Sequence, residues 1–406
     1  TDTRTQPGFI NVLTPAIVFV DGDNSSGTEN GASWATAFTT VQAGIDAADD
    51  AGGGEVGVAA GTYDEVRDND DGALLLMPLV EVYGGFAGTE TARAQRDVSE
   101  NESIIDGSTA RDGDPAYHVV LGASQTRLDG VTVTGGLADG TGQNALGAGM
   151  LNTGNTMTIA NCTLRGNTAV NFGGGMANSG ANITIENCIF ESNFVTNLAE
   201  DGSTALGAGL YVNFGRATIR GTVFTGNVAR SETTFTGAQT VNSEASGGGL
   251  YVFNGTVDVL GSRFAGNRVE SFGTGVNNEG PQTFVQPRAR GGGIFTRFAD
   301  IRIDGALVLE NEAEAEPNDT FSQACGAGIF NEDSFVEVAN TVVAQNVTRD
   351  QTNTAGGAGL CNDYSGTGAF SVVISNCTIA DNDTDSFNFA RVGGLLLRNV
   401  SPTVVN

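Results

Sequence analysis

The sequence predicts an all-β solenoid of about ten coils, a parallel β-helix built from short stacked strands. Three observations predict this fold. Gly and Asn are in excess, at 59 and 35 of 406 residues. Glycine clusters recur along the chain, and alternating apolar residues follow each cluster. Both residue types tolerate a left-handed backbone, so their recurrence marks repeated bends. With only 8 Pro, the glycine is not a collagen or linker signature.

Seven glycine clusters divide the chain from Gly147 onward into repeats. An Asn lies 18 residues after the last glycine in six repeats, and 23 residues after it in the seventh. Asn side chains at equivalent bends of stacked coils can bond the coil above and the coil below. We therefore expect a ladder of Asn167, Asn193, Asn227, Asn267, Asn311, Asn346 and Asn382.

The positions inside each repeat have constant characters. Eight and ten residues after the last glycine the chain is apolar, as at Ile183 and Ile185, which is strand alternation with one inward face. Two residues later a column of Asn or Gly predicts a left-handed bend: Asn161, Asn187, Gly221, Gly261, Gly305, Asn340 and, in the longer coil, Asn376. A repeat of this kind buries its apolar face only against its neighbours.

The earlier part of the chain predicts the end of the solenoid. We expect an N-terminal arm, first strand and capping helix in residues 1–60, irregular first coils in 61–145, and regular repeats in 146–406, all in one domain. Predicted strands are Ile17–Val20, Glu55–Ala59 and Leu79–Tyr83. A helical stripe covers Trp34, Phe38, Val41, Ile45 and Ala48, with a capping box in residues 39–42 and a glycine stop at 52–54. Such a helix would protect the open strand edges of the first coil.

The five cysteines fall into two groups. Cys162, Cys188 and Cys377 share one inward column of small residues, so we expect buried thiols. Cys325 and Cys361 stand five positions out of phase, and the sequence predicts no bridge between them. The single histidine, His118, lies in an apolar run and is expected to be a packed residue.

The charge balance limits the partners of the protein. The 19 basic residues are all Arg and face 47 acidic residues, for a net charge of −28. Such a surface repels phosphate backbones and anionic bilayers, so we expect no nucleic acid partner. With no run of 18 apolar residues, we also expect no direct membrane insertion.

Two sets of motifs carry a family resemblance. The glycine clusters followed by F-x-x-N, as in 190–193, 224–227 and 264–267, resemble the repeats of chlamydial polymorphic outer-membrane proteins and the right-handed β-helix regions of bacterial surface proteins. The segments 20–23, 32–38 and 58–63 resemble the cap and first coil of secreted pectate-lyase-like proteins. The resemblance implies a right-handed, single-stranded parallel β-helix outside a bacterial cell or on its surface. Such folds serve both adhesins and lyases.

Segments of variable length between each ladder Asn and the next glycine cluster are expected to form loops on one side of the rod. The longest spans residues 268–290, and loops of this kind carry partner contacts. We expect such contacts at Arg268, Glu270, Glu279, Arg288 and Arg290. Tolerated drift in loop length is an equal alternative, because long surface loops cost little.

These features favour a non-enzymatic extracellular rod, structural or adhesive, with protein subunits or surface glycans as partners. End-to-end self-assembly into filaments or a surface layer is a variant of this hypothesis, prompted by a last coil that the chain leaves unfinished at Asn406. The alternative is a secreted polysaccharide lyase or hydrolase. Without Lys and with one His, only Arg and carboxylates are left as acid or base, and no paired set is evident, so we predict no catalytic residues.

No organic cofactor is expected, and calcium is the one candidate ion. Asp21 and Asp23, and likewise Asp68 and Asp70, alternate oxygen ligands near a glycine turn. Hard cations prefer such oxygens, although neither segment has the full spacing of a known calcium loop. Solvated acidic turns are the more common interpretation of such segments.

Overall fold

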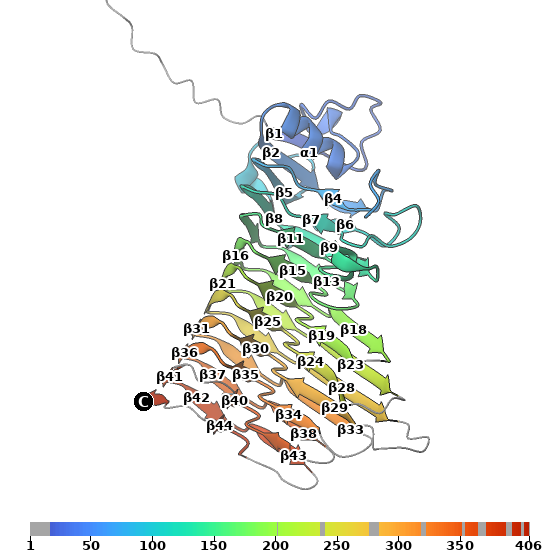
Figure 1. Ribbon diagram of the computed structural model, residues 1–406. Helices are drawn as coiled ribbons and strands as arrows, with labels where there is room; N and C mark the ends of the chain where they lie inside the picture. The colour runs from blue at the N-terminus through green and yellow to red at the C-terminus, as the bar shows by residue number, and fades with distance from the viewer. Residues whose placement is uncertain are drawn as a thin grey trace, which may run out of the picture.

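Parallel sheets dominate the computed structural model, which describes residues 17–200, 202–235, 240–275, 284–317, 322–350, 354–363, 371–386, 392–398 and 402–405. Three long sheets form the wall of a right-handed parallel β-helix, and two further sheets extend from it (Figure 1). None of the described helices has the length and apolar character needed to span a membrane. The predicted division at residues 60 and 145 stays a prediction, and its N-terminal arm lies outside the described residues up to residue 16.

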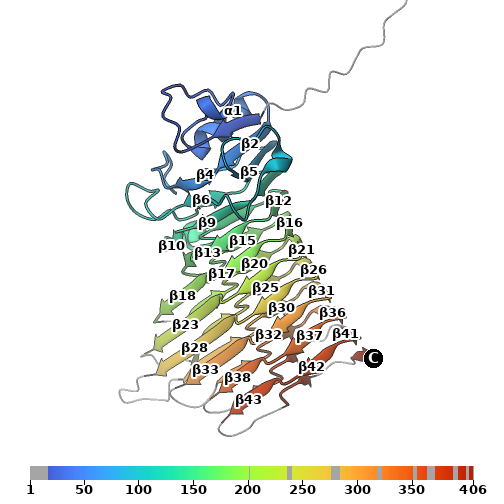
Figure 2. The ribbon, with the colours of Figure 1, turned by 180° about the vertical axis from the view of Figure 1, so that it is seen from behind.

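The three wall sheets run the length of the rod. Sheet 1 has 12 strands: β1 (Ile17–Val20), β2 (Gly54–Ala59), β5 (Val80–Phe86), β8 (Thr126–Asp129), β12 (Met157–Ala160), β16 (Asn182–Glu186), β21 (Arg216–Arg220), β26 (Thr256–Leu260), β31 (Asp300–Asp304), β36 (Phe335–Ala339), β41 (Val372–Ser375) and β45 (Thr403–Val405). Sheet 2, seen in Figure 2, has 10: β3 (Gly61–Tyr63), β6 (Ser103–Asp106), β9 (Val131–Thr134), β13 (Thr163–Arg165), β17 (Ile189–Glu191), β22 (Val223–Thr225), β27 (Arg263–Ala265), β32 (Leu307–Leu309), β37 (Val342–Ala344) and β42 (Thr378–Ala380). Sheet 3 also has 10: β4 (Leu74–Leu75), β7 (Val120–Leu121), β11 (Met150–Thr153), β15 (Met176–Ser179), β20 (Leu210–Asn213), β25 (Leu250–Phe253), β30 (Ile294–Arg297), β35 (Ile329–Glu332), β40 (Leu360–Asp363) and β44 (Leu395–Leu397).

The core lies between the three wall sheets and is built from columns of like residues. Each regular coil contributes inward side chains from sheet 1, sheet 2 and sheet 3, so that every residue packs on its counterpart one coil away. Phe190, Phe224 and Phe264 show this directly, with neighbouring ring centroids 4.8 and 4.6 Å apart. The predicted strands before residue 90 are confirmed as β1, β2 and β5.

The bends between sheet 1 and sheet 2 confirm the predicted column of Asn and Gly. Every residue of the column has a positive φ, between 49° and 66°: Asn161, Asn187, Gly221, Gly261, Gly305, Asn340 and Asn376. Asn and Gly adopt this conformation with little steric cost, and it turns the chain sharply between two strands.

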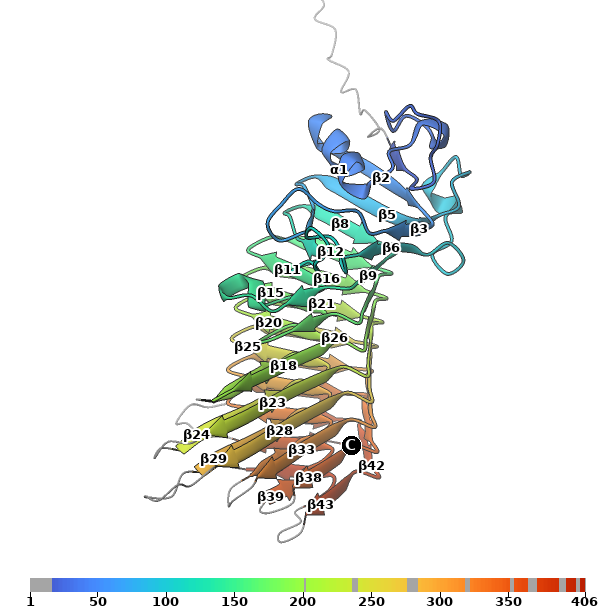
Figure 3. The same cartoon turned by 90° about the vertical axis from the view of Figure 1, so that its right-hand side faces the viewer.

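The segments predicted as loops on one side of the rod are strands, so that prediction is wrong for their described parts. They form a fin of two parallel sheets packed face to face, which projects from the wall in Figure 3. One sheet contains β10 (Leu137–Ala138), β14 (Thr168–Ala169), β18 (Phe194–Ala199), β23 (Val228–Phe235), β28 (Arg268–Gly275), β33 (Glu312–Pro317), β38 (Val347–Asp350) and β43 (Asp383–Ser386); the other contains β19 (Ser203–Leu206), β24 (Thr240–Ser246), β29 (Phe284–Arg290), β34 (Gln323–Cys325) and β39 (Thr354–Gly356).

Small side chains explain how the two fin sheets pack. The buried layer between them consists mainly of alanines, such as Ala229 and Ala245, together with hydroxyl side chains. Ser231 Oγ lies 2.6 Å from Ser203 Oγ and 2.7 Å from Ser243 Oγ. The hydroxyls satisfy one another away from water. In the sequence, alternating small and polar residues are typical of a loop, because the second sheet that buries the small ones is not evident there.

The helix found in this region is shorter than the helical stripe predicted, and its role as a cap stays a prediction. Helix α1 (Val41–Asp50) begins after Thr40, whose side chain accepts a hydrogen bond from the backbone N–H of Ala43. Helix α1 lies at the N-terminal end of the rod (Figure 1). Its apolar residues Val41, Ile45 and Ala48 belong to the core.

Two residues of the predicted helical stripe lie outside the helix. Phe38 precedes the cap, and Trp34 begins the short 3₁₀ turn η1 (Trp34–Thr36). The ring of Trp34 packs between Phe19 and Phe86, with centroids 4.6 and 5.4 Å away. These aromatic contacts, rather than the helical period, determine its position. Two further 3₁₀ turns are η2 (Arg93–Gln95) and η3 (Gly142–Ala145).

Cys325 and Cys361 form a disulfide, which corrects the expectation that they are unbridged. Cys325 ends β34 in the fin, Cys361 lies in β40 of sheet 3, and their Cα atoms are 6.0 Å apart. The chain reverses at each glycine cluster, where Gly326 and Gly357 have positive φ. Cys325, which precedes one glycine cluster, therefore lies beside Cys361, which follows the next glycine cluster. The positions of the two cysteines along the repeat do not reveal this reversal of the chain. The thiols of Cys162 and Cys188 are free and buried.

Candidate functional site

A polar hollow lies on the outer face of sheet 1, near the N-terminal end of the rod. It has a volume of about 570 Å³ and is lined by Glu55, Glu81, Tyr83, Arg93, Arg96, Arg127, Asp129 and Asn161. We call it the charged hollow. Most of its residues come from β2, β5 and β8, whose alternate side chains point outward. Arg93 belongs to η2, and Arg96 is the residue that follows η2.

Asp129 is the buried centre of the charged hollow. Its carboxylate accepts hydrogen bonds from Arg96 Nη2 at 2.5 Å and from Asn161 Nδ2 at 2.8 Å, and Arg127 Nη2 lies 2.7 Å away. Burial pushes the pKa of Asp129 upward, but these hydrogen bonds and the two guanidinium charges hold it below its usual value. Asp129 is therefore ionised at neutral pH and fixes both arginines.

The ring of Tyr83 lies close to two guanidinium groups. Its hydroxyl donates to Glu81 Oε2 at 2.7 Å, and the guanidinium carbons of Arg93 and Arg96 lie 4.5 and 5.2 Å from its ring centroid. Burial and the hydrogen bond to Glu81 raise the pKa of Tyr83 well above its usual value. The phenol therefore stays protonated, and it acts as a donor rather than a base.

The charged hollow suits binding better than catalysis. Arg93 Nη1 lies 2.7 Å from Glu55 Oε1, so all three carboxylates of the hollow have a guanidinium or phenol partner. The guanidinium groups carry no base and the phenol of Tyr83 keeps its proton, so only the carboxylates could take a proton from a substrate, and these are already engaged as hydrogen-bond acceptors. What the hollow offers instead is an array of charged donors and acceptors, which can bind the hydroxyls of a polar ligand.

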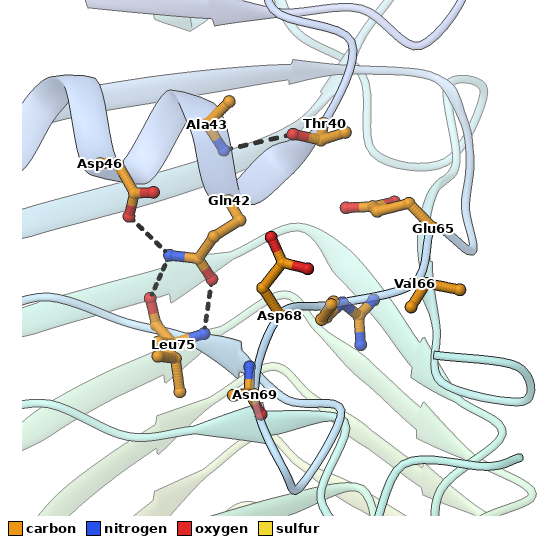
Figure 4. Close-up of a pocket in the computed structure, with 10 residues that line it drawn as sticks. Thr40, Gln42, Ala43, Asp46, Glu65, Val66, Asp68, Asn69 and Leu75 are labelled. Atoms are coloured by element: carbon orange, nitrogen blue, oxygen red, sulfur yellow. Dashed lines mark hydrogen bonds between the residues drawn. The ribbon is translucent and has the colours of Figure 1, made fainter. Parts of the chain in front are cut away.

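A second hollow of about 440 Å³ lies beside α1. Gln42 closes one side, since its Oε1 accepts from Leu75 N at 2.8 Å and its Nε2 donates to Asp46 Oδ1 at 2.8 Å. Figure 4 shows the carboxylates of Glu65 and Asp68 directed into the same space. The hollow is acidic, and it contains one member of the predicted calcium pairs.

The calcium candidates are placed on separate exposed turns. Asp21 follows β1 and accepts a hydrogen bond from the backbone N–H of Asp23 at 3.0 Å, while Asp68 and Asp70 belong to a later turn. Within the described ranges, no three His, Cys, Asp or Glu residues gather in a way that could hold a metal ion. Calcium binding stays a prediction.

The seven ladder asparagines form one hydrogen-bonded column. From Asn167 to Asn346, each Nδ2 donates to the Oδ1 of the next ladder Asn, at 2.8–3.1 Å. The same Oδ1 also accepts the backbone N–H of the preceding ladder residue. This column is structural, and it positions the fin where each coil leaves the wall.

Four of the five residues expected to meet partners lie in fin strands, and Glu279 lies outside the described residues. Arg268 and Glu270 lie in β28, where Arg268 Nη1 is 2.8 Å from Glu270 Oε1. Arg288 and Arg290 lie in β29. These positions are strands rather than loops, and a partner for them stays a prediction.

Arg290 is buried and serves the fold. It reaches Glu244 Oε1 at 2.6 Å and Glu332 Oε2 at 3.3 Å, and its guanidinium carbon lies 5.3 and 5.2 Å from the ring centroids of the stacked pair Phe295 and Phe330. Burial pushes the pKa of Glu244 upward, but the charge of Arg290 holds it below its usual value. His118 is likewise a packed residue, with Nδ1 3.1 Å from Gly147 O, and burial lowers its pKa.

Sequence reasoning missed the charged hollow. Its residues come from five segments that are distant in the sequence, and the register of sheet 1 places Glu81 beside Arg127 and Tyr83 beside Asp129. The available signal was the outward alternation of Glu81 and Tyr83 in a predicted strand.

No protein-family model matches the chain, and no curated protein matches it. Among solved structures, the A-module of mannuronan C-5 epimerase AlgE6 from Azotobacter vinelandii is 14% identical over 90% of this chain and 94% of its own, with a TM-score of 0.33. The AlgE4 A-module from the same organism is 13% identical over 90% of each chain, with a TM-score of 0.32. PfbA, a surface adhesin of Streptococcus pneumoniae, is 11% identical over 90% of this chain and 89% of its own, with a TM-score of 0.28.

Proposed function

We propose that the protein is a non-enzymatic adhesive rod that works outside a bacterial cell or on its surface and binds surface glycans through sheet 1. The observation that carries the proposal is the charged hollow, in which charged donors and acceptors are held rigidly and each carboxylate has a partner. A preorganised array of this kind binds hydroxyl groups at a low entropic cost.

Two further features support this proposal. The outer face of sheet 1 spans 12 strands, which is about 50 Å at a strand spacing of ~4.8 Å, long enough to hold an extended ligand. The disulfide between Cys325 and Cys361 fits an oxidising compartment, because such bridges persist mainly outside the cytosol.

A substitution at Arg93 tests the proposal. Arg93 has the most exposed guanidinium in the charged hollow, with 45% of its side chain accessible. We expect Arg93→Ala to weaken retention of the purified protein on its target polysaccharide about tenfold, because a charge-assisted hydrogen bond contributes roughly 1.5–3 kcal/mol. The measurement is biolayer interferometry against a panel of immobilised neutral and acidic polysaccharides.

Arg230→Ala is the matched control. Arg230 is equally exposed and also pairs with a glutamate, but it lies in the fin. Equal losses in both variants would mean that the charged hollow is not the binding site. A wild-type protein that is retained by no polysaccharide would contradict the proposed function itself.

The second candidate function is a secreted enzyme that acts on polysaccharides. The observation that favours it is the convergence of Arg, Tyr and carboxylate groups in one open hollow. New reducing or unsaturated ends on a polysaccharide, lost in a Tyr83→Phe variant, would support the enzyme. Filaments of the purified protein in electron micrographs would support self-assembly, with other subunits as partners.

A further inference from the structure

Four phenylalanines mark the corner where the chain passes from sheet 3 to sheet 1. Phe214, Phe253, Phe298 and Phe335 come from four consecutive coils, one ring from each. We call this row the aromatic corner. The side chains of Phe214, Phe298 and Phe335 are 62%, 44% and 45% exposed, and that of Phe253 is partly buried. Large exposed apolar groups that gather in this way mark binding surfaces more often than scattered ones do.

The backbone at the aromatic corner indicates that stability does not account for these rings. Phe214 and Phe298 have φ values of 50° and 52°, a left-handed conformation that bulky residues rarely adopt. The register places Gly180, Asn254 and Asp333 at the same corner in neighbouring coils. Gly, Asn and Asp tolerate a left-handed backbone conformation better than Phe does. The two Phe residues therefore combine a strained backbone with a ring that stays partly in water, a combination that Asn or Gly at this corner avoids.

The rings of Phe214, Phe253 and Phe298 form a narrow strip that runs from coil to coil along the rod. The centroid of Phe253 lies 6.0 Å from that of Phe214 and 6.0 Å from that of Phe298, both in edge-to-face geometry. The strip is one ring wide, because each coil contributes one Phe. A protein partner usually needs about 800 Å² of surface from each side, with a wide apolar centre.

A groove of about 300 Å³ runs beside the strip on the outer face of sheet 1. Phe335 lines it together with charged residues of both signs, Asp258, Asp300, Arg302 and Glu337. The ligand that fits this surface has one apolar face for the rings and a polar edge for the groove. A sugar ring has both, and the units of an extended polysaccharide repeat at a distance close to the spacing of the coils.

We propose that the aromatic corner and its groove bind an extended, neutral polysaccharide that lies along the rod. This inference rests on the proposed function and names the class of ligand. The CH face of each sugar would stack on a phenylalanine, and its hydroxyls would bond to the groove carboxylates and Arg302. A net charge of −28 disfavours a polyanionic chain.

The test is calorimetric titration of the full chain with cellohexaose, a neutral β-1,4-linked probe, and with an oligogalacturonate of the same length. The variant is Phe214→Asn combined with Phe298→Asn. Asn fits the corner backbone, since Asn254 occupies it with a φ of 49°. We expect the double variant to keep or raise the unfolding temperature and to weaken cellohexaose binding at least tenfold. Phe194→Asn, at an exposed ring in the fin, is the control and should leave binding unchanged.

Two outcomes would overturn the inference and leave the proposed function standing. One is cellohexaose binding that is equal in the wild type and the double variant. The other is binding of the oligogalacturonate alone. A wild-type protein that binds neither probe, nor any member of the polysaccharide panel, would overturn both.

Discussion

Asparagine has two separate roles in this chain, and burial distinguishes them. A ladder residue such as Asn227 is completely buried, and its amide is saturated by neighbouring coils. A bend residue such as Asn187 serves through its backbone conformation, which Gly221 supplies in the next coil. The ladder therefore requires the side-chain amide of Asn, while the bend requires only a residue that tolerates a positive φ.

Replacing one ladder residue should cost much of the stability of the protein. Asn227 Nδ2 donates to Asn267 Oδ1 at 2.8 Å and to Phe190 O at 2.9 Å, and its Oδ1 accepts two bonds from Asn193. Asn227→Ala leaves these buried groups without partners, so we expect a loss of about 3 kcal/mol of unfolding free energy. Denaturant unfolding measures it, with the exposed Asn182→Ala as control. Similar losses in both variants would contradict the structural role of the ladder.

The depressed pKa of Asp129 predicts a dependence of stability on pH. Because its folded pKa lies below its unfolded value of about 3.9, the carboxylate stabilises the fold fully above that value. That stabilisation is lost as the pH falls through the folded pKa. We expect Asp129→Asn to cost about 3 kcal/mol at pH 7, where it leaves two guanidinium groups without their carboxylate.

Urea unfolding of the wild type and of Asp129→Asn between pH 7 and pH 2.5 measures this effect. The difference in unfolding free energy should shrink on acidification. Asp304→Asn, on the exposed part of the same sheet face, should cost less than about 1 kcal/mol. A difference for Asp129 that stays constant across the range would show that its charge does not stabilise the fold.

At the scale of elements, the disulfide joins the fin to the wall across two neighbouring coils. Cys325 lies in β34, Cys361 lies in β40, and 36 residues separate them in the sequence. We expect reduction to lower the unfolding free energy by about 2–4 kcal/mol, since the bridge restricts the unfolded chain.

Thermal unfolding with and without reductant tests the bridge. The wild type should lose stability in reductant, while a Cys325→Ser, Cys361→Ser variant should be equally unstable in both conditions. If the wild type unfolds at the same temperature with and without reductant, the bridge contributes nothing.

The sequence predicts the elements well wherever the repeat determines them. The strand Ile17–Val20 and the positive φ at Asn161 and its counterparts were predicted, because inward alternation and a left-handed bend leave direct signals in residue type. The fin and the disulfide were not predicted. Ala229 and Ser231 resemble loop residues until a second sheet packs on them, and Cys325 meets Cys361 only because the glycine cluster reverses the chain.

The candidate site was harder to predict than the fold, for a related reason. Asp129, Arg96 and Tyr83 are distant in the sequence and meet through the register of the irregular first coils. The alternation of Glu81 and Tyr83 shows which face they share, but it does not show which strand lies beside them. Single exposed residues such as Phe214 leave no periodic signal at all.

The whole molecule combines an acidic surface with a long, rigid face. Sheet 1 runs the length of the rod beside the two other wall sheets, and the charged hollow and the aromatic corner both lie along it. Rigid presentation of several weak contacts along an extended ligand is the physical basis of avidity. This arrangement is the reason for proposing adhesion without chemistry.

Adhesion without chemistry is tested most directly by one incubation that measures binding and chemical change together. The purified chain is mixed with soluble polysaccharides for many hours, retention is measured by affinity electrophoresis, and the polysaccharides are analysed for chain length and for new reducing or unsaturated ends. We predict that at least one polysaccharide retards the protein and keeps its chain length and end groups unchanged. Shortened chains or unsaturated ends, at a rate that follows the amount of protein, would contradict the account and establish an enzyme.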